Sequence, residues 1–273
     1  MNKVRMTQKS YGFLWSMCGN NTEIKRWHFN DMQAVVPEPI VRGRMGLEVG
    51  SGCGYDTFIM AESNPGVRIF SFDISNGVYR NKQLTAGLNN VCVLKASVSS
   101  IPLKDCIFDF AYSYGVLHHI PRPEIGMQEI SRVIKKGAPL FLYLYEDHAG
   151  DKLKSIALNI VKILRHVTTR MPAKLLYFLS YLSSPFIVIL FSFPATVLGK
   201  FKATKALSQR LPFNYATHLF SAAGDLYDRF ATPIEHRFGA KELIGLFDKN
   251  GFTKVNIAKI DSKAGWVAWG YKV

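Results

Sequence analysis

The residues of this sequence whose types and spacing best suit chemistry are the glycines of one short loop, EVGSGCG at 48–54. The loop completes an apolar run, MGLEVG at 45–50, which predicts a buried strand that ends in a tight turn. Glycines at this spacing let a backbone turn sharply and approach a bound molecule closely. An ordinary strand-to-helix turn would need no ligand, but a glycine loop directly after the first strand of an α/β pattern favours a cofactor site.

The loop differs from the two common phosphate-binding loops. Its pattern is G-x-G-x-G, and Tyr55 stands where the dinucleotide fingerprint G-x-G-x-x-G has its last glycine. No Lys-Ser or Lys-Thr pair follows, which excludes a P-loop. Glu48 lies within the strand, where a carboxylate is poorly placed for a pyrophosphate but suits a ligand that carries an amino group.

A second carboxylate, Asp73, follows the apolar run VRIFSF at 67–72, about twenty residues beyond the loop. At the end of a second strand it can accept hydrogen bonds from ribose hydroxyls. The alternative is that Asp73 caps a helix that begins near Ser75. Because it accompanies the glycine loop, we favour the ribose role.

The elements that must position these residues alternate between strands and helices. Apolar and β-branched runs predict strands at 45–50, 67–72, 91–95, 107–113 and 139–146, with helices at 55–63, 75–88 and 123–135 between them. This alternation predicts a doubly wound parallel sheet with helices on both faces. The ligand is then expected at the carboxyl ends of the strands.

The alternation stops after about residue 149. Residues 151–174 predict a basic amphipathic helix, and residues 175–199 contain no charged side chain. The α/β pattern resumes with a helix at 239–250 and two strands, 253–260 and 265–273, which a short turn joins as a hairpin.

Several motifs together resemble the class I S-adenosylmethionine-dependent methyltransferases of the small-molecule, type 11 group. The glycine loop LEVGSGCG (47–54) is similar to the family's first motif, and FSFDIS (70–75) to its acidic second motif. The stretches FDFAYSYGVLHHIPRP (108–123) and EISRVIKKGAPLFLYL (129–144) resemble the regions of its fourth and fifth strands. A later stretch, 227–252, resembles the part before the last two strands.

The resemblance implies an α/β fold, a doubly wound Rossmann-like sheet of seven strands, mostly parallel with the last strand antiparallel. A helical, hydrophobic and basic insertion follows the fifth strand. We expect residues 1–148 and 225–273 to form the methyltransferase domain, and residues 149–224 to form the insertion.

The same resemblance implies S-adenosylmethionine as the cofactor and assigns roles to seven residues. Glu48 is expected near the methionine amino end and Asp73 at the ribose hydroxyls, while the floor beneath the cofactor comes from Gly50, Ser51, Gly52 and Gly54. Many relatives hold the adenine amino group with an aspartate after the third strand. Here Ser97 stands at that position, so the adenine contact loses its charge assistance.

Methyl transfer from a sulfonium needs alignment and exclusion of water more than acid or base catalysis. A base helps only where the acceptor must lose a proton. The candidates are His118 and His119 after the fourth strand, Glu146 after the fifth strand, and His236. The histidine pair is common in the family whatever the substrate, so we expect it to be structural, and the catalytic residue stays unknown. No spacing of histidines and carboxylates predicts a metal site.

The formal charge of the 273-residue chain is +14, and most of it lies in one segment. Residues 152–210 carry ten Lys and Arg and no Asp or Glu. Subtracting these ten from the 34 basic residues leaves 24 against 20 acidic ones. The basic character therefore belongs to the insertion and indicates an anionic partner for it.

Three interpretations of the uncharged stretch 175–199 compete. It is long enough to cross a bilayer, but a single crossing would separate two parts of one sheet, and Pro185 and Pro194 interrupt a straight helix. It can instead lie in one leaflet between basic flanks, or pack as a lid on the catalytic domain. We favour the interfacial position over the lid.

The sequence therefore predicts an enzyme that methylates a small or lipid-linked acceptor, most readily at oxygen, on the inner face of a membrane. A nucleic-acid methyltransferase is an alternative that the net charge suggests, but the signature N/D-P-P-Y/F is absent and nucleic acid is not the expected partner. A non-catalytic, membrane-associated protein that binds S-adenosylmethionine is a third reading. Four cysteines without metal spacing and an N-terminus without an apolar core favour a cytoplasmic location.

Overall fold

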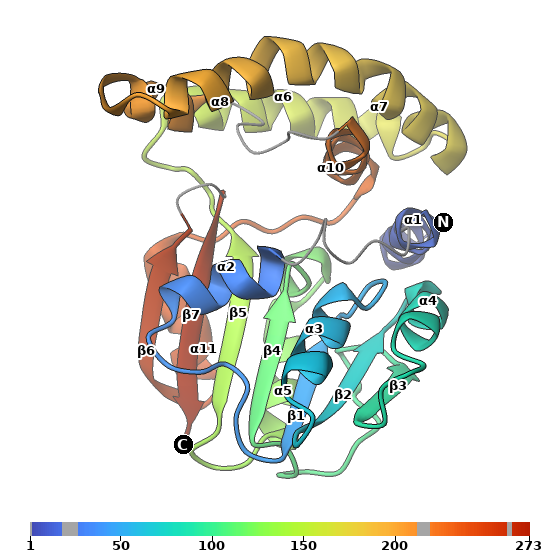
Figure 1. The fold of residues 1–273 in the computed structure, drawn as a ribbon, viewed down its shortest axis with the longest axis vertical. Coiled ribbons are helices and arrows are strands. Elements are labelled where there is room, and N and C mark those ends of the chain that lie inside the picture. The colour runs from blue at the N-terminus through green and yellow to red at the C-terminus, as the bar shows by residue number, and fades with distance from the viewer. Residues whose placement is uncertain (1, 18–26, 212–218, 261–263) are drawn as a thin grey trace. The chain divides into compact units, whose positions relative to one another are not determined.

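The computed structural model of the chain describes residues 2–17, 27–211, 219–260 and 264–273. The chain forms two compact units (Figure 1). The sheet unit takes in residues 1–150, 234–260 and 264–273, and the helical unit takes in residues 151–233.

The sheet unit is built on seven strands in the order β3-β2-β1-β4-β5-β7-β6 (Figure 1). The first five pair in parallel, whereas β7 pairs antiparallel to both β5 and β6. This confirms the expected Rossmann-like sheet with the last strand antiparallel. The strands are β1 (Met45–Val49), β2 (Arg68–Asp73), β3 (Val91–Lys95), β4 (Phe110–Tyr114), β5 (Pro139–Tyr145), β6 (Phe252–Lys259) and β7 (Gly265–Lys272).

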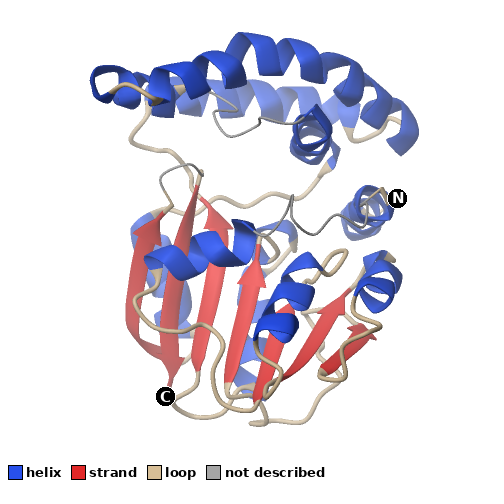
Figure 2. Ribbon diagram, in the orientation of Figure 1, coloured by secondary structure: helices blue, strands red, loops and turns tan. Residues whose placement is uncertain are grey.

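Helices cover both faces of this sheet (Figure 2). On one face the strands pack against α5 (Pro123–Val133) and α11 (Ala240–Lys249), through side chains such as Ile130 and Phe247. On the other face they pack against α2 (Trp27–Val35) and α3 (Tyr55–Ser63), through Met32 and Met60 among others. Each such buried side chain stabilises the fold by about 1.5–3 kcal/mol.

The strand register brings the expected cofactor residues to one edge of the sheet. Val49, the last residue of β1, pairs with Phe72, so the loop that follows β1 lies beside Asp73 at the end of β2. Asp73 in turn pairs with Lys95 at the end of β3. The carboxyl ends of the three strands therefore meet, and this is where ligands bind in such sheets.

The helical unit contains α6 (Lys152–Thr168), α7 (Ala173–Ile187), α8 (Phe193–Gly199), α9 (Lys205–Arg210) and α10 (Leu219–Ala231). A π-helical segment, Val188–Ser192, joins α7 to α8. Pro185 lies inside α7 and Pro194 lies in the first turn of α8. The chain therefore stays helical past both prolines, with the wider π-helical segment between them.

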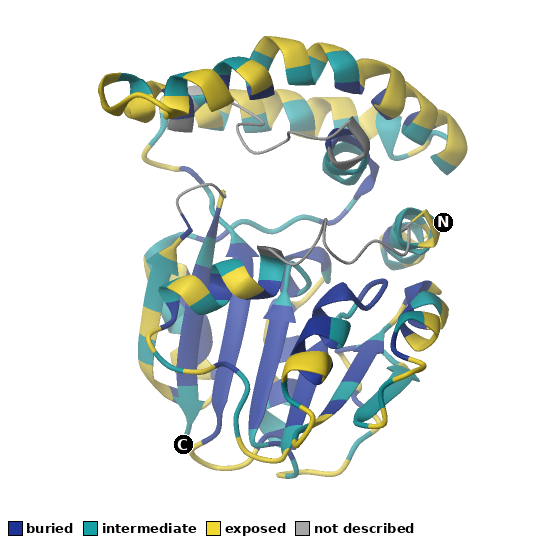
Figure 3. Ribbon diagram, in the orientation of Figure 1, coloured by how far each residue is buried: buried dark blue, intermediate teal, exposed yellow. Residues whose placement is uncertain are grey.

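Among the described residues, one helix is long and apolar enough to cross a membrane by length and composition, the run Ala173–Gly199 of 27 residues. Only 22% of its most apolar window is buried. Figure 3 shows exposed residues along much of α6, α7 and α8, whereas the strands of the sheet unit are mostly buried.

The limits of the insertion differ slightly from those expected. The expected boundary after residue 224 falls within α10, and the chain rejoins the sheet unit only at Ile234. The start of the insertion, expected at 149, lies at Asp151, which caps α6 by accepting a hydrogen bond from the Lys154 amide.

Candidate cofactor and acceptor site

The glycine loop is fixed to the end of β2 by its own backbone. The amides of Gly50 and Ser51 both donate to the carbonyl oxygen of Phe72, at 2.8 and 2.9 Å. Gly54 has a φ of +90°, and a Cβ there would come within 2.4 Å of the side chain of Asn81. The loop therefore has this shape only with glycine at position 54.

Beneath the loop lies a buried polar network around Glu48. Its Oε2 accepts hydrogen bonds from the hydroxyls of Thr57 and Ser71, the latter at 2.9 Å. The Asn81 amide on α4 (Gly77–Leu84) donates to both hydroxyls, at 2.9 Å each. Strands β1 and β2 and helices α3 and α4 thus meet at one carboxyl group, which holds the loop from below.

Burial raises the pKa of Glu48 to about 8, and the nearby carboxylate of Asp56 adds to this rise. The hydrogen bonds from Thr57 and Ser71 act in the opposite direction but do not outweigh burial. At neutral pH Glu48 is therefore mostly protonated. This position beneath the loop gives Glu48 a supporting role, beside the contact with a cofactor amino group that the resemblance implies.

Asp73 ties the loop to the start of α4. Its Oδ2 accepts from the Gly52 amide at 3.0 Å, and its Oδ1 accepts from the Ser75 amide at 2.7 Å. The capping interaction weighed as an alternative is thus present as a turn before α4. A carboxylate has about four acceptor positions, so Asp73 can still accept two hydroxyl groups from a ligand.

The geometry of the loop fits S-adenosylmethionine. The hydroxyl oxygen of Ser51 is buried and makes no hydrogen bond within the described part of the chain. Buried polar atoms almost always have a hydrogen-bond partner, so a ligand group bound over the loop would supply the partner of the Ser51 hydroxyl. The Ser51 hydroxyl can therefore contact a ligand, and the Asp73 carboxylate beside it can accept hydrogen bonds from two ligand hydroxyls on the same edge of the sheet.

Ser97 lies just beyond β3, on the same edge as Asp73. It forms a short turn in which its Oγ accepts from the Ser99 amide at 3.2 Å and its carbonyl accepts from the Ser100 amide. Because Oγ of Ser97 is the acceptor in the bond from Ser99, its hydroxyl proton stays available to donate to a ligand nitrogen. The assignment of Ser97 to adenine stays a prediction.

A helix that the sequence reasoning did not identify, α1 (Lys3–Ser16), packs on the glycine loop. The ring of Trp15 lies 2.8 Å from where a Cβ of Gly52 would stand. The Gln8 amide donates to the carbonyl of Ile74 at 2.8 Å, and the ring of Tyr11 lies 5.2 Å from that of His119. One helix thus borders the loop, the end of β2 and the histidine pair.

The histidines expected near the acceptor gather after β4. His118 and His119 form a short helical turn there, and the backbone amide of His236 donates to the carbonyl of His118 at 2.8 Å. Nδ1 of His119 donates to the carbonyl of Ile234 at 2.9 Å. A neutral His119 therefore carries its lone pair on Nε2. These contacts bring three of the four catalytic candidates together.

Aromatic rings continue the site along the ends of β4 and β5. Tyr114 and Tyr143 stack at 4.3 Å between ring centroids, and Tyr145 stacks on His118 at 3.9 Å. Burial raises the pKa of Tyr114 well above its usual value, with a further contribution from Tyr143. Tyr114 therefore stays a neutral phenol near pH 7.

Glu146, the fourth catalytic candidate, engages other side chains. Its Oε1 pairs with Lys259 at 2.7 Å, and its Oε2 lies 3.3 Å from Nδ1 of His148. The first contact joins the end of β5 to β6, and the second stays within the segment that follows β5. This use favours a structural role for Glu146 over proton transfer.

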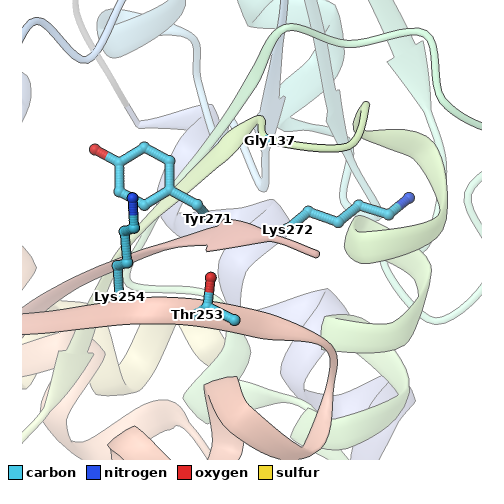
Figure 4. A pocket seen from close by; sticks show the side chains of 5 residues that line it. All are labelled: Gly137, Thr253, Lys254, Tyr271 and Lys272. Carbon is cyan, nitrogen blue, oxygen red and sulfur yellow. The ribbon is translucent and has the colours of Figure 1, made fainter.

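Metal-ligand groups and cavities were the remaining candidates for a binding site. In the described ranges no three His, Cys, Asp or Glu side chains are grouped as a metal would require. A pocket of about 490 Å³ is lined by Gly137, Thr253, Lys254, Tyr271 and Lys272 (Figure 4). Because Gly137 precedes β5, this pocket lies at the amino end of that strand, opposite the edge that carries the glycine loop.

Part of the sequence matches known proteins. Residues 47–142 match the family model described as a methyltransferase domain. A tRNA U34 carboxymethyltransferase from Ruthia magnifica is 34% identical over 105 residues, which cover 37% of this chain and 33% of that protein. The chain thus matches about one third of that relative's length.

Two solved structures share the fold. A SAM-dependent methyltransferase from Aquifex aeolicus superposes with a TM-score of 0.53 at 16% identity, covering 91% of this chain and 93% of the other. Human N-acetylserotonin methyltransferase, solved in complex with SAM, gives 0.54 at 13% identity, covering 97% and 56%. The chain therefore contains a region, residues 47–142, that matches a methyltransferase domain, and it shares the fold of these two methyltransferases.

Proposed function

We propose that this protein transfers a methyl group from S-adenosylmethionine to an oxygen of a small or lipid-linked acceptor, at the inner, cytoplasmic face of a membrane. The observation that carries the transfer is the glycine loop, in which Asp73 binds the Gly52 amide and the Ser51 hydroxyl is buried without a partner in the described chain. Bound there, S-adenosylmethionine supplies a methyl group that is already activated for displacement.

The histidine pair supports a hydroxyl acceptor. Nε2 of His119 is the basic nitrogen of the neutral ring, because Nδ1 donates to Ile234. It can hold the proton that a hydroxyl releases while its oxygen gains the methyl group. The stacked rings of Tyr114 and Tyr143, with the ring of Tyr145 edge-on to Tyr143, suit an acceptor with flat or apolar groups.

The charge of the insertion supports an acceptor held at a membrane. The insertion leaves the sheet unit soon after β5 and returns at Ile234, so both of its connections lie at the strand edge that carries the acceptor candidates. Its lysines and arginines between 152 and 210 have no acidic residues among them, which suits an anionic lipid surface.

A nucleic-acid acceptor is the second candidate, favoured by the similarity to a tRNA U34 carboxymethyltransferase. The basic residues of 152–210 would then bind phosphates. Against this, the basic residues flank a long apolar helical run, where nucleic-acid interfaces are polar.

The test is incubation of the full-length protein with methyl-labelled S-adenosylmethionine and either a membrane-lipid extract or total tRNA, followed by mass spectrometry of the labelled product. We expect label in a lipid-extractable hydroxyl compound. Label in tRNA alone would replace this proposal by the second candidate, and cofactor binding without label in either fraction would favour a protein that binds the cofactor without catalysis.

The cofactor site is tested separately by calorimetry. Asp73→Ala removes both ribose acceptors and the bond to the Gly52 amide, so we expect cofactor affinity to fall by roughly a hundredfold or more. Asp248→Ala, at an exposed position on α11, is the matched control and should bind as the wild type does. Equal affinity in Asp73→Ala would show that the site is misassigned.

A further inference from the structure

We propose that the outer faces of α6 and of the run α7–α8 insert into one leaflet of an anionic bilayer without crossing it. The proposal identifies an anionic bilayer as the partner of the helical unit. Only the identity of the methyl acceptor rests on the proposed function. The membrane contact itself depends on the helical unit alone and is tested without catalysis.

The run α7–α8 has its polarity inverted relative to a helix of a water-soluble protein. Ser184 and Ser192 are buried, each 1% exposed, whereas Phe186 and Phe193 are each 65% exposed. A helix at a protein surface in water normally turns its apolar side inward and its polar side outward. Here the small residues face the protein and the large apolar ones face outward, as membrane-embedded helices do.

The buried serines are satisfied within the helical unit. The hydroxyl of Ser180 donates to the carbonyl of Leu176 at 2.8 Å, and that of Ser184 donates to the carbonyl of Tyr181 at 2.7 Å. The small side chains let α7 pack against α10, where Ala222 and Ala223 are fully buried. Packing of small residues with hydroxyls bonded to backbone carbonyls needs no water at the helix contact.

Helix α6 adds a second apolar stripe. Ile156, Ile160, Ile163 and Val167 recur at spacings of four, three and four residues, so they share one face, and each is more than half exposed. The other side of α6 is anchored in the unit, since Nε of Arg165 donates to the carbonyl of Arg229 and Oγ1 of Thr168 donates to that of Phe230. The stripe is thus presented by a fixed helix.

Positive charges stand at both ends of the apolar run. Lys174 lies at its start, and Lys200, Lys202 and Lys205 follow its end, all with exposed side chains. Because residues 152–210 contain no Asp or Glu, no acidic group within the segment competes for these lysines. Each lysine near an anionic surface favours binding by about 1 kcal/mol, which selects phosphatidylglycerol-like lipids over neutral ones.

The connections of the unit favour insertion into one leaflet. Both ends of the insertion join the same sheet, so the chain must return to the side from which it entered. The described residues contain only one helix that is apolar and long enough to span. A single crossing would place the two parts of the sheet on opposite sides of the bilayer, whereas helices lying in the interface leave them together.

The test is sedimentation of the full-length protein with vesicles of phosphatidylcholine, with or without phosphatidylglycerol. We expect binding to the vesicles that contain phosphatidylglycerol, and a roughly hundredfold loss in the double variant Phe186→Asp/Phe193→Asp, because two aromatic side chains no longer leave water. Tyr79→Asp, at a similarly exposed aromatic residue of α4, is the matched control and should bind as the wild type does.

Wild-type protein that stays in the supernatant with both vesicles would overturn the proposal. So would a dimer in light scattering that the double variant converts to a monomer, because a second copy would then cover this face. Cofactor affinity should be unchanged in the double variant, because the cofactor binds at the glycine loop and the membrane contact depends on the helical unit. Vesicle binding without methyl transfer to any lipid would reject a lipid-linked acceptor and leave the membrane contact standing.

Discussion

The buried carboxyl of Glu48 should make folding stability fall as the pH rises. Its pKa is about 8 in the folded protein against a usual value of 4.5. The folded state therefore binds a proton that the unfolded state has already released between these two values. The stabilising contribution is complete below the unfolded pKa and is lost as the pH rises through the folded pKa.

The size of the effect follows from the same two values. One pKa unit corresponds to about 1.4 kcal/mol, so the full contribution of Glu48 is about 5 kcal/mol. Integrated between about pH 5 and about pH 7, the loss is about 2.5 kcal/mol. That is a large part of the stability of an ordinary domain, about 5–15 kcal/mol.

Urea unfolding of the wild type and of Glu48→Gln, at several pH values, isolates this contribution. Glutamine stays neutral and keeps an oxygen for the Thr57 and Ser71 hydroxyls, so the difference in unfolding free energy between the two proteins should shift toward the variant by about 2.5 kcal/mol between about pH 5 and about pH 7. Glu242→Gln, at an exposed glutamate of α11, should show no such shift. A pH-independent difference for Glu48→Gln would refute the raised pKa.

Two further predictions concern the support of the glycine loop. Gly54→Ala should lower the free energy of unfolding by at least about 2 kcal/mol in urea titration, because φ is +90° and the new Cβ meets Asn81; an unchanged midpoint would contradict the loop geometry. Asn81→Ala removes the amide that donates to the hydroxyls of Thr57 and Ser71 and should cost about 1–3 kcal/mol, with Lys82→Ala at an exposed position of α4 as its control.

The sheet could be predicted because its strands are apolar runs bounded by glycine, proline or aspartate. The observed boundaries differ from the predicted ones where backbone amides form hydrogen bonds outside the regular strand or helix. The strand expected at 107–113 begins only at Phe110, since the amides of Ile107 and Phe108 bond to the carbonyl of Val133 outside the sheet. The helix expected from 75 begins at Gly77, because Asp73 and Ser75 form a turn first.

The candidate site could be predicted only where glycine spacing marks it. The loop and Asp73 are local motifs, whereas Thr57, Ser71 and Asn81 are ordinary polar residues whose meeting at Glu48 depends on the packing of two helices on two strands. Helix α1 was missed for the same reason. The partner of Trp15 is the glycine loop, which is remote in the sequence, so no local pattern marks the contact.

Composition alone does not decide between a lid and a membrane-bound insertion, because both require a long apolar segment. The distinction depends on which residues of that segment face the protein. A lid that folds onto a domain in water buries its phenylalanines, whereas a segment that meets lipid can bury its serines and expose its phenylalanines without penalty. Within the helical unit Ser184 is buried and Phe186 is exposed, which is the pattern expected if the segment meets lipid, and the lysines that border the run would then contact anionic headgroups.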